Sequence, residues 1–296
     1  MFERRYFIVA QNFHGTTLLS KLLNDHPEVV SLGDTYPSNR IDQVCGCGRC
    51  VSECPFWAAV SDAVDAERYR DHPHLLPDYP RIIGDRVDRV LYNGLGPKVL
   101  QRVIPASARA GFARDFEAFE AAVWEHSGRP EATVFVDGVK SISRVYALMA
   151  SGVRVDGVIH LWRGPGDYIK STMKQKGRSR RVFLPRMVEY RLFHRLARRA
   201  AGHVPYMSLT YEGLTYSPDE TLKALFGLVG VEPRSVAELV AEKKEQPWHF
   251  MGNASLFHFD GTIRPSRHAL TLQERRLARL LGGRYDPKRL HLRSPS

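Results

Sequence analysis

The sequence predicts an α/β fold with three layers, α/β/α, around a central and mostly parallel β-sheet. Short apolar runs typical of buried strands recur along the chain, and each is followed by a turn and then by a segment whose apolar residues have helical spacing. The length of 296 residues is sufficient for a sizeable core. Strands that alternate with helices form parallel sheets, which bind ligands at the carboxyl ends of their strands. We therefore expect one domain over residues 1–296, with its binding site at that edge.

The first strand, turn and helix lie at the start of the sequence. Residues 6–10, YFIVA, are apolar and β-prone and predict a buried strand. After Gly15 the apolar spacing becomes helical, and the Asp-His-Pro of residues 25–27 ends the helix. Its apolar positions are four leucines, Leu18, Leu19, Leu22 and Leu23.

The same alternation returns in the second half of the chain. Strands are expected at 132–140, 155–163 and 204–214, and the last of these ranges includes the turn that follows the strand. Helices are expected at 57–72, 112–127, 143–150, 166–175, 183–200 and 217–231. In the last helix, Ser217 is the expected N-cap, Pro218 takes the first helical position, and Glu220 would close a capping box. The region between 72 and 112 is punctuated by proline and glycine and predicts no element.

The net charge of +11, from 43 lysines and arginines against 32 acidic residues, indicates an anionic partner. Nucleic acid, an anionic membrane surface and a phosphorylated cofactor all fit this charge, and a solvated basic surface fits it equally well. The basic residues concentrate at 170–181, at 191–199 and near the C-terminus. Because no apolar run approaches the ~20 residues of a membrane span and no secretion signal precedes the first strand, we expect a cytoplasmic protein.

The turn after the first strand is the clearest candidate for an anion site. Its sequence, HGTTLL, places one glycine and two threonines directly before the helix. The first amides of a helix have no partner within it and carry the positive end of its dipole, and threonine hydroxyls add donors. No Gly-Lys-Ser or Gly-Lys-Thr occurs, so the turn differs from an ATP-binding P-loop. The pattern predicts a site for one terminal anion at His14, Gly15, Thr16, Thr17 and Leu18.

Residues 13–19 and the following His26-Pro27 resemble the loop of the sulfotransferases that use 3′-phosphoadenosine 5′-phosphosulfate (PAPS). That loop commonly reads Arg/Lys-Ser-Gly-Thr-Thr-Leu-Leu and is followed by a helix and His-Pro. The resemblance, which extends to the bacterial branch of the family, implies a P-loop-like sulfotransferase fold. It also implies transfer of a sulfuryl group from PAPS to a hydroxyl or amine of a small-molecule, lipid or carbohydrate acceptor, with no nucleic-acid partner.

Two further blocks of that family concern the nucleotide. Arg163 ends a strand and Ser171 follows eight residues later, like the family's pair that binds the 3′-phosphate. Independently, an arginine at a strand end can clamp a phosphate through two N–H groups, and Ser171, two turns into the next helix, can face the same pocket. Tyr211, in TYEGL, is similar to a family residue near the nucleotide.

The remaining blocks also occur in family order. Asp137 and Lys140 resemble an Asp-x-x-Lys block after a strand, and HFMGN at 249–253 resembles a His-x-x-Gly-Asn stretch of bacterial members. Residues 55–130 match no block. We expect them to form a helical insertion that binds the acceptor.

The loop departs from the family at its start. Where the family has a cation before Ser-Gly-Thr-Thr, this chain has Phe13, and His14 replaces the serine. That cation normally contacts the bridging oxygen on which charge develops as sulfate leaves. His14 or Lys140 would have to take its place, or the chain would transfer sulfate poorly. Alternatively, His14 only forms hydrogen bonds within the loop.

A carboxylate candidate for the general base follows the first helix. Asp34, in HPEVVSLGD, lies at the offset where tyrosylprotein and several bacterial sulfotransferases have a catalytic glutamate. An aspartate after glycine is also a common turn residue, so a purely structural role stays open.

All four cysteines, Cys45, Cys47, Cys50 and Cys54, lie within ten residues. Four thiolates at this spacing have the composition of a zinc site, and CGRC resembles a zinc knuckle. One local disulfide, an iron–sulfur cluster and reduced free thiols are the alternatives. We expect a structural staple, made by zinc or by a disulfide, and no catalytic role.

Two other functions fit parts of the sequence. A P-loop nucleotide kinase would share the strand, turn and helix, but the missing Gly-Lys-Ser/Thr disfavours it. A basic nucleic-acid-binding protein with a cysteine-rich knuckle would use the net charge, and its binding would depend steeply on salt.

Overall fold

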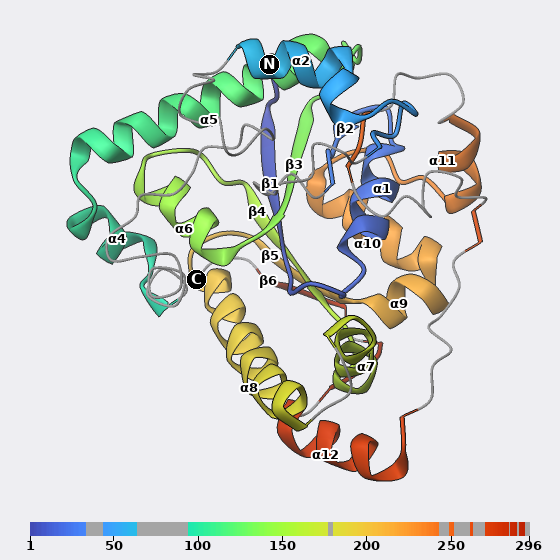
Figure 1. Ribbon diagram of the computed structural model, residues 1–296. Coiled ribbons are helices and arrows are strands. Elements are labelled where there is room, and N and C mark those ends of the chain that lie inside the picture. Colours follow the sequence, from blue (N-terminus) through green and yellow to red (C-terminus); the bar gives the residue numbers. More distant parts are fainter. Residues whose placement is uncertain are drawn as a thin grey trace.

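The computed structural model describes residues 1–33, 44–63, 94–176, 180–242, 249–251, 261–262, 270–283, 285–288 and 290–293. Its centre is a six-stranded sheet in the order β2-β3-β1-β4-β5-β6 (Figure 1). The first five strands in this order are parallel, and β6 runs antiparallel to β5. The strands are β1 Arg4–Val9, β2 Val29–Val30, β3 Val134–Lys140, β4 Gly157–Trp162, β5 Tyr206–Thr210 and β6 His291–Arg293. The predicted mostly parallel sheet is confirmed.

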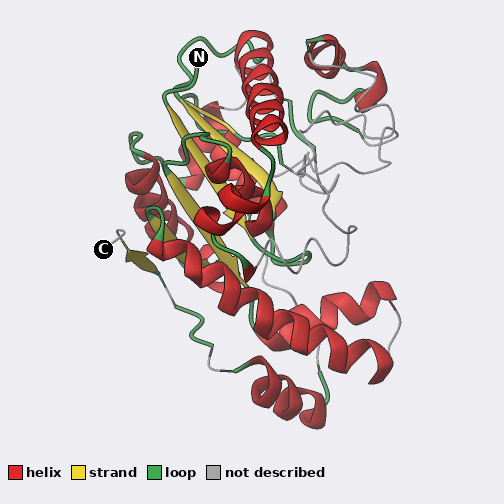
Figure 2. Cartoon of the chain, turned by 90° about the vertical axis from the view of Figure 1, so that its left-hand side faces the viewer, coloured by secondary structure: helices red, strands yellow, loops and turns green. Residues whose placement is uncertain are grey.

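Helices cover both faces of this sheet, which makes three layers (Figure 2). Along β1, Phe7 and Val9 belong to one hydrophobic cluster and Tyr6 and Ile8 to the other, since side chains alternate across a strand. Helices on the Phe7 face are α2 Pro55–Asp62, α4 Pro97–Val103, α5 Ala106–His126 and α6 Ile142–Ala150. Helices on the Tyr6 face are α1 Thr16–Asn24, α9 Tyr211–Tyr216, α10 Pro218–Val229 and α11 Val236–Glu242.

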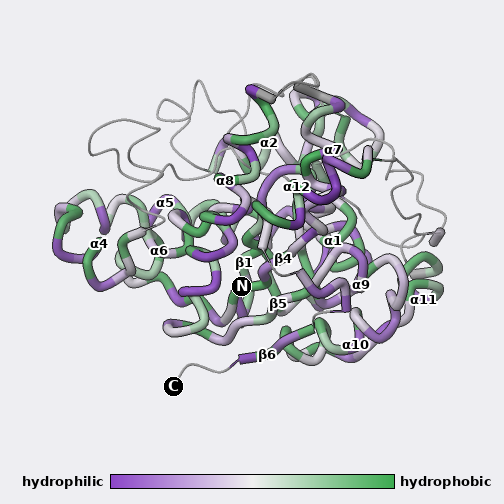
Figure 3. The backbone as a smooth tube through the Cα atoms, turned by 90° about the horizontal axis from the view of Figure 1, so that it is seen from below, coloured by the Kyte–Doolittle hydropathy of each residue, from purple (hydrophilic) through white to green (hydrophobic). Residues whose placement is uncertain are grey.

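A third hydrophobic cluster lies beyond the carboxyl ends of the strands, in the lower part of Figure 1. It joins three helices, α7 Pro165–Lys176, α8 Arg180–Ala197 and α12 Leu272–Gly282. Two 3₁₀ turns complete the described elements, η1 Val51–Glu53 and η2 Arg198–Gly202. Figure 3 shows hydrophobic residues along the central strands and a mixture of hydrophobic and hydrophilic residues along the surrounding helices.

Most elements expected from the sequence are present, with shifted ends. The helix expected at 57–72 begins at Pro55 and is described as far as Asp62, and the one expected at 112–127 begins at Ala106. Helix α4 lies in the region for which the sequence predicted no element. Among the described residues, no helix is long and apolar enough to cross a membrane.

The capping box expected at Ser217 is wrong. Ser217 precedes α10, but its side chain makes no capping hydrogen bond. The residue also ends α9, and its φ of −138° and ψ of 62° serve that junction. A capping box does form at the start of α12, where Thr271 and Glu274 satisfy each other's backbone amides.

Candidate functional site

The turn between β1 and α1 has the backbone geometry of an anion-binding loop. Phe13 and Gly15 have φ angles of 68° and 89°, in the left-handed region that bulky residues rarely adopt. A side chain at position 15 would also overlap the ring of Tyr211, so glycine is required on two counts. The first backbone hydrogen bond of α1 runs from the Leu19 amide to the Gly15 carbonyl, at 3.2 Å. The three amides before Leu19 therefore point out of the helix end, where they favour an anion.

Arg163, directly after β4, holds this loop in place. Its side chain is 8% exposed, and its Nη1 donates a hydrogen bond of 2.7 Å to the Phe13 carbonyl oxygen. The guanidinium lies 4.6 Å from the centre of the Tyr211 ring, in a cation–π contact. Within the described part of the chain, Arg163 Nε has no hydrogen-bond partner. One buried donor of the arginine is thus available to a ligand.

Lys170, on α7, brings a second buried cation to the same place. Its side chain is 8% exposed, and its Nζ finds no hydrogen-bond partner among the described residues. Asp167 lies 3.8 Å from Nζ, and the Asp167 side chain is 40% exposed. Burial lowers the pKa of Lys170; the charge of Asp167 opposes this effect, and the charge of Arg163 adds to it. Buried positive charges favour an anion beside them.

The sequence predicted Ser171 for this region and missed its neighbour Lys170. Ser171 is half-buried on α7, one residue after the lysine. Lys170 belongs to the basic run at 170–181, in which composition alone does not separate a buried lysine from solvated ones. Its position next to Ser171 and seven residues after Arg163 was the available signal.

His14 lies beneath the loop, in a chain of hydrogen bonds between buried side chains. His14 Nε2 is 3.0 Å from His194 Nε2, and His194 Nδ1 is 2.8 Å from His160 Nε2. Tyr206 Oη and the Trp162 indole N–H both contact His160 Nδ1, the indole at 3.1 Å. All three imidazoles are buried. The chain links the loop to α8, β4 and β5.

The direction of every bond in this chain follows from its two ends. At one end, the Asn12 carbonyl, 3.2 Å from His14 Nδ1, only accepts, so that nitrogen carries a proton and His14 Nε2 accepts from His194. At the other end, the indole only donates, so His160 Nδ1 accepts and its Nε2 donates to His194. The indole end requires neutral imidazoles along the whole chain, and the carbonyl end agrees with this arrangement. Accordingly, burial lowers the pKa of His14 to about 3 and that of His194 well below its usual value.

Lys140 ends β3 next to the loop. It has a φ of 72°, and its carbonyl accepts a hydrogen bond of 3.2 Å from the Ala10 amide. The charge of Lys140 contributes to the lowered pKa of His14, so the ammonium group lies within electrostatic range of the loop. Asp137, in the same strand, is buried and forms an ion pair of 3.0 Å with Arg144. The Asp-x-x-Lys block therefore brings its lysine, and not its aspartate, toward the anion site.

Asp34, the expected general base, lies outside the described residues. The preceding Gly33 is described and has a φ of 79°. A side chain at Gly33 would overlap the Met251 carbonyl and the Phe250 ring, and one at Gly138 would overlap the Gly33 carbonyl. The chain that leads to Asp34 is thus fixed between β3 and residues 249–251.

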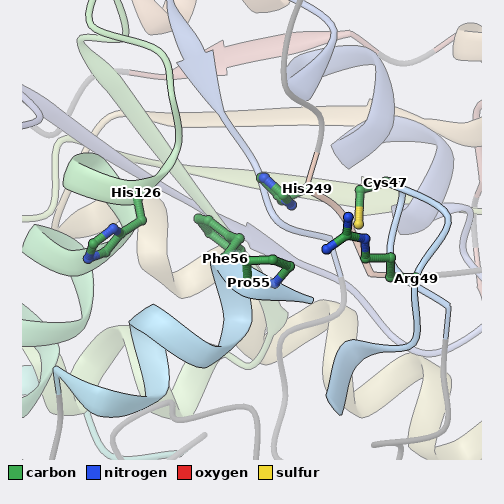
Figure 4. A pocket seen from close by; sticks show the side chains of 6 residues that line it. All are labelled: Cys47, Arg49, Pro55, Phe56, His126 and His249. Carbon is green, nitrogen blue, oxygen red and sulfur yellow. The ribbon is translucent and has the colours of Figure 1, made fainter. Parts of the chain in front are cut away.

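Three of the four cysteines form a group with a histidine from a distant part of the chain; Figure 4 labels two of its members, Cys47 and His249. The sulfur atoms of Cys45, Cys47 and Cys54 and a ring nitrogen of His249 all lie within 4.8 Å of one another. No disulfide links the cysteines, and Cys50 lies outside the group. Such a set has the composition to hold a metal ion. No local spacing in the sequence links His249 to the cysteines, because it lies 195 residues from Cys54.

A cavity of about 460 Å³ opens beside this group and is lined by Cys47, Arg49, Pro55, Phe56, His126 and His249 (Figure 4). Burial raises the pKa of the Cys45 thiol to about 12 and also raises that of Cys54. Burial lowers the pKa of His249 to about 4. The imidazole is therefore neutral near pH 7, and the two buried thiols hold their protons more tightly than a free cysteine does.

Neither a protein-family model nor a curated protein matches the amino-acid sequence. Among solved structures, the fold is similar to the sulfotransferase domain of the olefin synthase from Synechococcus PCC 7002, at 13% identity and a TM-score of 0.47 over 96% of this chain and 95% of that one. It is similar to the sulfotransferase domain from the curacin biosynthetic pathway, at 13% identity and a TM-score of 0.48 over 97% and 99%. A sulfotransferase from Mycobacterium tuberculosis H37Rv aligns at 15% identity and a TM-score of 0.42 over 83% and 72%.

The neutral histidine chain makes stability depend on pH. Below pH ~6.5 the unfolded chain protonates His14, whereas the folded chain does so only near pH 3, so the free energy of unfolding decreases as the pH falls between these values. From pH 7 to pH 5 this one residue should cost on the order of 2 kcal/mol. His14→Gln keeps a donor and an acceptor but does not titrate, so its urea midpoint should fall less over this interval than the wild-type midpoint. Equal decreases in the two proteins would show that His14 is already charged in the folded state.

Proposed function

We propose that this protein is a sulfotransferase that transfers a sulfuryl group from PAPS to a hydroxyl or amine acceptor. One observation carries the proposal: at the carboxyl edge of the sheet, the amides of residues 16–18 point out of the start of α1, and the buried Arg163, which holds this loop, has an Nε without a hydrogen-bond partner among the described residues. An anion with negative groups at two separate positions could accept hydrogen bonds from the helix amides at one position and from the cationic side chains at the other. The sequence resemblance assigns the same loop and the same arginine to the two ends of PAPS.

In this proposal the 5′-phosphosulfate lies against the start of α1. The amides of Thr16, Thr17 and Leu18 and the two threonine hydroxyls would donate to it. Gly15 permits the close approach of backbone to anion, because a side chain there would strain the turn. His14 would contribute from beneath, by fixing the loop through its bonds to Asn12 and His194.

The 3′-phosphate would lie between Arg163, Lys170 and Ser171. Arg163 already uses Nη1 to hold the loop, and its Nε is free to bind the phosphate. Lys170 would add a point charge, and the Ser171 hydroxyl a hydrogen bond. The Tyr211 ring, stacked on the guanidinium, keeps Arg163 in this orientation.

Transfer would run in line. The acceptor oxygen or nitrogen attacks sulfur, the bond from sulfur to the bridging oxygen breaks, and adenosine 3′,5′-bisphosphate leaves with the electron pair. Charge then develops on the bridging oxygen, where a cation stabilises it. Lys140 is the better candidate for this cation than His14, because both nitrogens of the buried His14 are already hydrogen-bonded.

The acceptor must also lose a proton, and we assign this step to Asp34. Its carboxylate would take the proton as the new bond to sulfur forms. We further propose that the region 55–130, which supplies α2, α4 and α5, shapes the acceptor pocket for a small molecule, a lipid or a carbohydrate.

The donor assignment is tested with adenosine 3′,5′-bisphosphate, the product that remains after transfer. This ligand should raise the melting temperature of the wild-type protein, because it stabilises only the folded state. Lys170→Ala should remove much of the shift, whereas Lys174→Ala, an exposed lysine one turn further along α7, should keep it. Arg163→Ala should remove most of the shift as well.

The nucleoside monophosphate 5′-AMP is the control for the 3′-phosphate. If 5′-AMP stabilises the wild-type protein as strongly as the bisphosphate does, Arg163, Lys170 and Ser171 do not bind a 3′-phosphate. Thermal shifts measured at two salt concentrations, with inorganic phosphate as a further control, separate specific binding from screening by the general charge.

The base assignment is tested by Asp34→Asn, which keeps the size of the side chain and removes its basicity. A general base contributes typically 10²- to 10⁴-fold, so kcat should fall by about this factor while the stabilisation by adenosine 3′,5′-bisphosphate persists. His14→Gln should weaken nucleotide binding through the loop. The opposite pattern, with wild-type kcat in Asp34→Asn and lost kcat but intact nucleotide binding in His14→Gln, would make His14 the base.

A further inference from the structure

We propose that Cys45, Cys47, Cys54 and His249 bind one zinc ion, which fastens the segment 44–54 to the distant segment 249–251. The three sulfurs and the ring nitrogen come from two parts of the chain that are about two hundred residues apart. Cys50 is not a ligand in this site. The proposal does not depend on the sulfotransferase assignment.

Three of the six distances between the ligand atoms match a tetrahedral zinc site, and all six lie within 4.8 Å. Zinc lies about 2.3 Å from sulfur and about 2.0–2.1 Å from nitrogen, so tetrahedral angles place two sulfurs about 3.8 Å apart and a sulfur and a nitrogen about 3.6 Å apart. Cys47 and Cys54 have their sulfurs 3.6 Å apart. His249 Nδ1 lies 3.5 Å from the Cys54 sulfur and 3.8 Å from the Cys45 sulfur. A single ion at the centre of the group would therefore need only small shifts of these ligand atoms.

The backbone around the cysteines is folded as a tight turn. Val44 and Cys50 form an antiparallel bridge, and the Cys45 amide donates to the Arg49 carbonyl at 2.7 Å. Gly48 has a φ of 87°, and its amide donates to the Cys45 carbonyl at 2.8 Å. This turn directs Cys45 and Cys47 to one side. Cys50 pairs with Val44 across this turn and lies outside the group.

An aromatic contact fixes the orientation of the imidazole of the proposed ligand His249. The His249 ring is stacked on Phe56, with 4.4 Å between centroids and 7° between planes.

The ion would connect three segments at the β2 edge of the sheet. The Gly46 amide donates to the Phe250 carbonyl at 2.9 Å, and the Met251 amide donates to the Leu32 carbonyl at 2.8 Å. Gly33 pairs with Met251 in a parallel bridge, so residues 249–251 continue the sheet beyond β2. The zinc site would therefore hold the segment that leads into Asp34.

The proposed role is structural. Four protein ligands close the coordination sphere, which leaves no position for a substrate. Cys54 caps the start of α2, which lies in Figure 1 toward the end of the sheet where β1 begins. The anion loop lies at the end where β1 finishes. Loss of the ion should thus lower stability without abolishing nucleotide binding.

The test is elemental analysis of reduced full-length protein after dialysis against a buffer with zinc and then against one without it. About one zinc per chain is expected for the wild type. Cys47→Ser, a single-atom change at an exposed position, should lose most of the zinc and unfold at a lower temperature. Cys50→Ser, three residues away, is the matched control and should keep both the zinc and the wild-type melting temperature.

Two further measurements do not depend on whether a variant folds. A chelator should lower the melting temperature of the wild-type protein, and added zinc should restore it. Cobalt substituted for zinc should show the visible absorption of a tetrahedral thiolate site in Cys50→Ser as in the wild type. Metal-free wild-type protein, bound iron in place of zinc, or equal loss of zinc in the two variants would overturn the proposal.

Discussion

The geometry of the anion loop depends on one side chain, the buried guanidinium of Arg163. Phe13 and Gly15 adopt left-handed backbone conformations, which persist in a bulky residue only when the surroundings impose them. Arg163 imposes them through the Phe13 carbonyl and through Tyr211, whose ring occupies the space above Gly15. A buried guanidinium is itself costly unless its donors are satisfied and its charge is balanced. The group that shapes the loop is therefore also a buried cation with a donor, Nε, that has no hydrogen-bond partner among the described residues.

The histidine chain supports the same loop from the side of the sheet. A hydroxyl at position 14 would be too short to reach α8, whereas the imidazole of His14 contacts His194 directly. Because each imidazole in the chain both donates and accepts, a proton added to any of them would set two donors against each other. The chain is thus stable only in its neutral form. The positive field of the site comes from Arg163, Lys170 and Lys140, and the histidines fix the backbone on which these charges act.

Local patterns in the sequence predicted the sheet, most helices and the loop, because strand and helix periodicities are properties of neighbouring residues. The pairing of His14 with His194 and of the cysteines with His249 joins residues 180 or more positions apart, and no local spacing encodes it. The local sequence pattern also did not show where one residue would have to serve two neighbouring helices. Ser217 and Thr271 each precede a glutamate by three residues, yet only Thr271 forms a capping box, since Ser217 already ends another helix. Lys170 was not predicted, because it belongs to a run of basic residues and composition does not show which of them is buried.

The contacts that complete the site come largely from the C-terminal half of the chain. Glu212 accepts a hydrogen bond of 3.0 Å from the Gly164 amide and a second from Tyr285, which fixes the turn after Arg163. Residues 249–251 fix Leu32 and Gly33 on the opposite side of β1. A strand, a glycine turn and a helix alone would leave the loop free to move, and each donor would then have to be ordered when the anion binds. Donors that are fixed beforehand cost no reorganisation at that moment. In the proposed function, the long-range contacts of this fold would therefore fix the charged donors of this edge before a ligand binds.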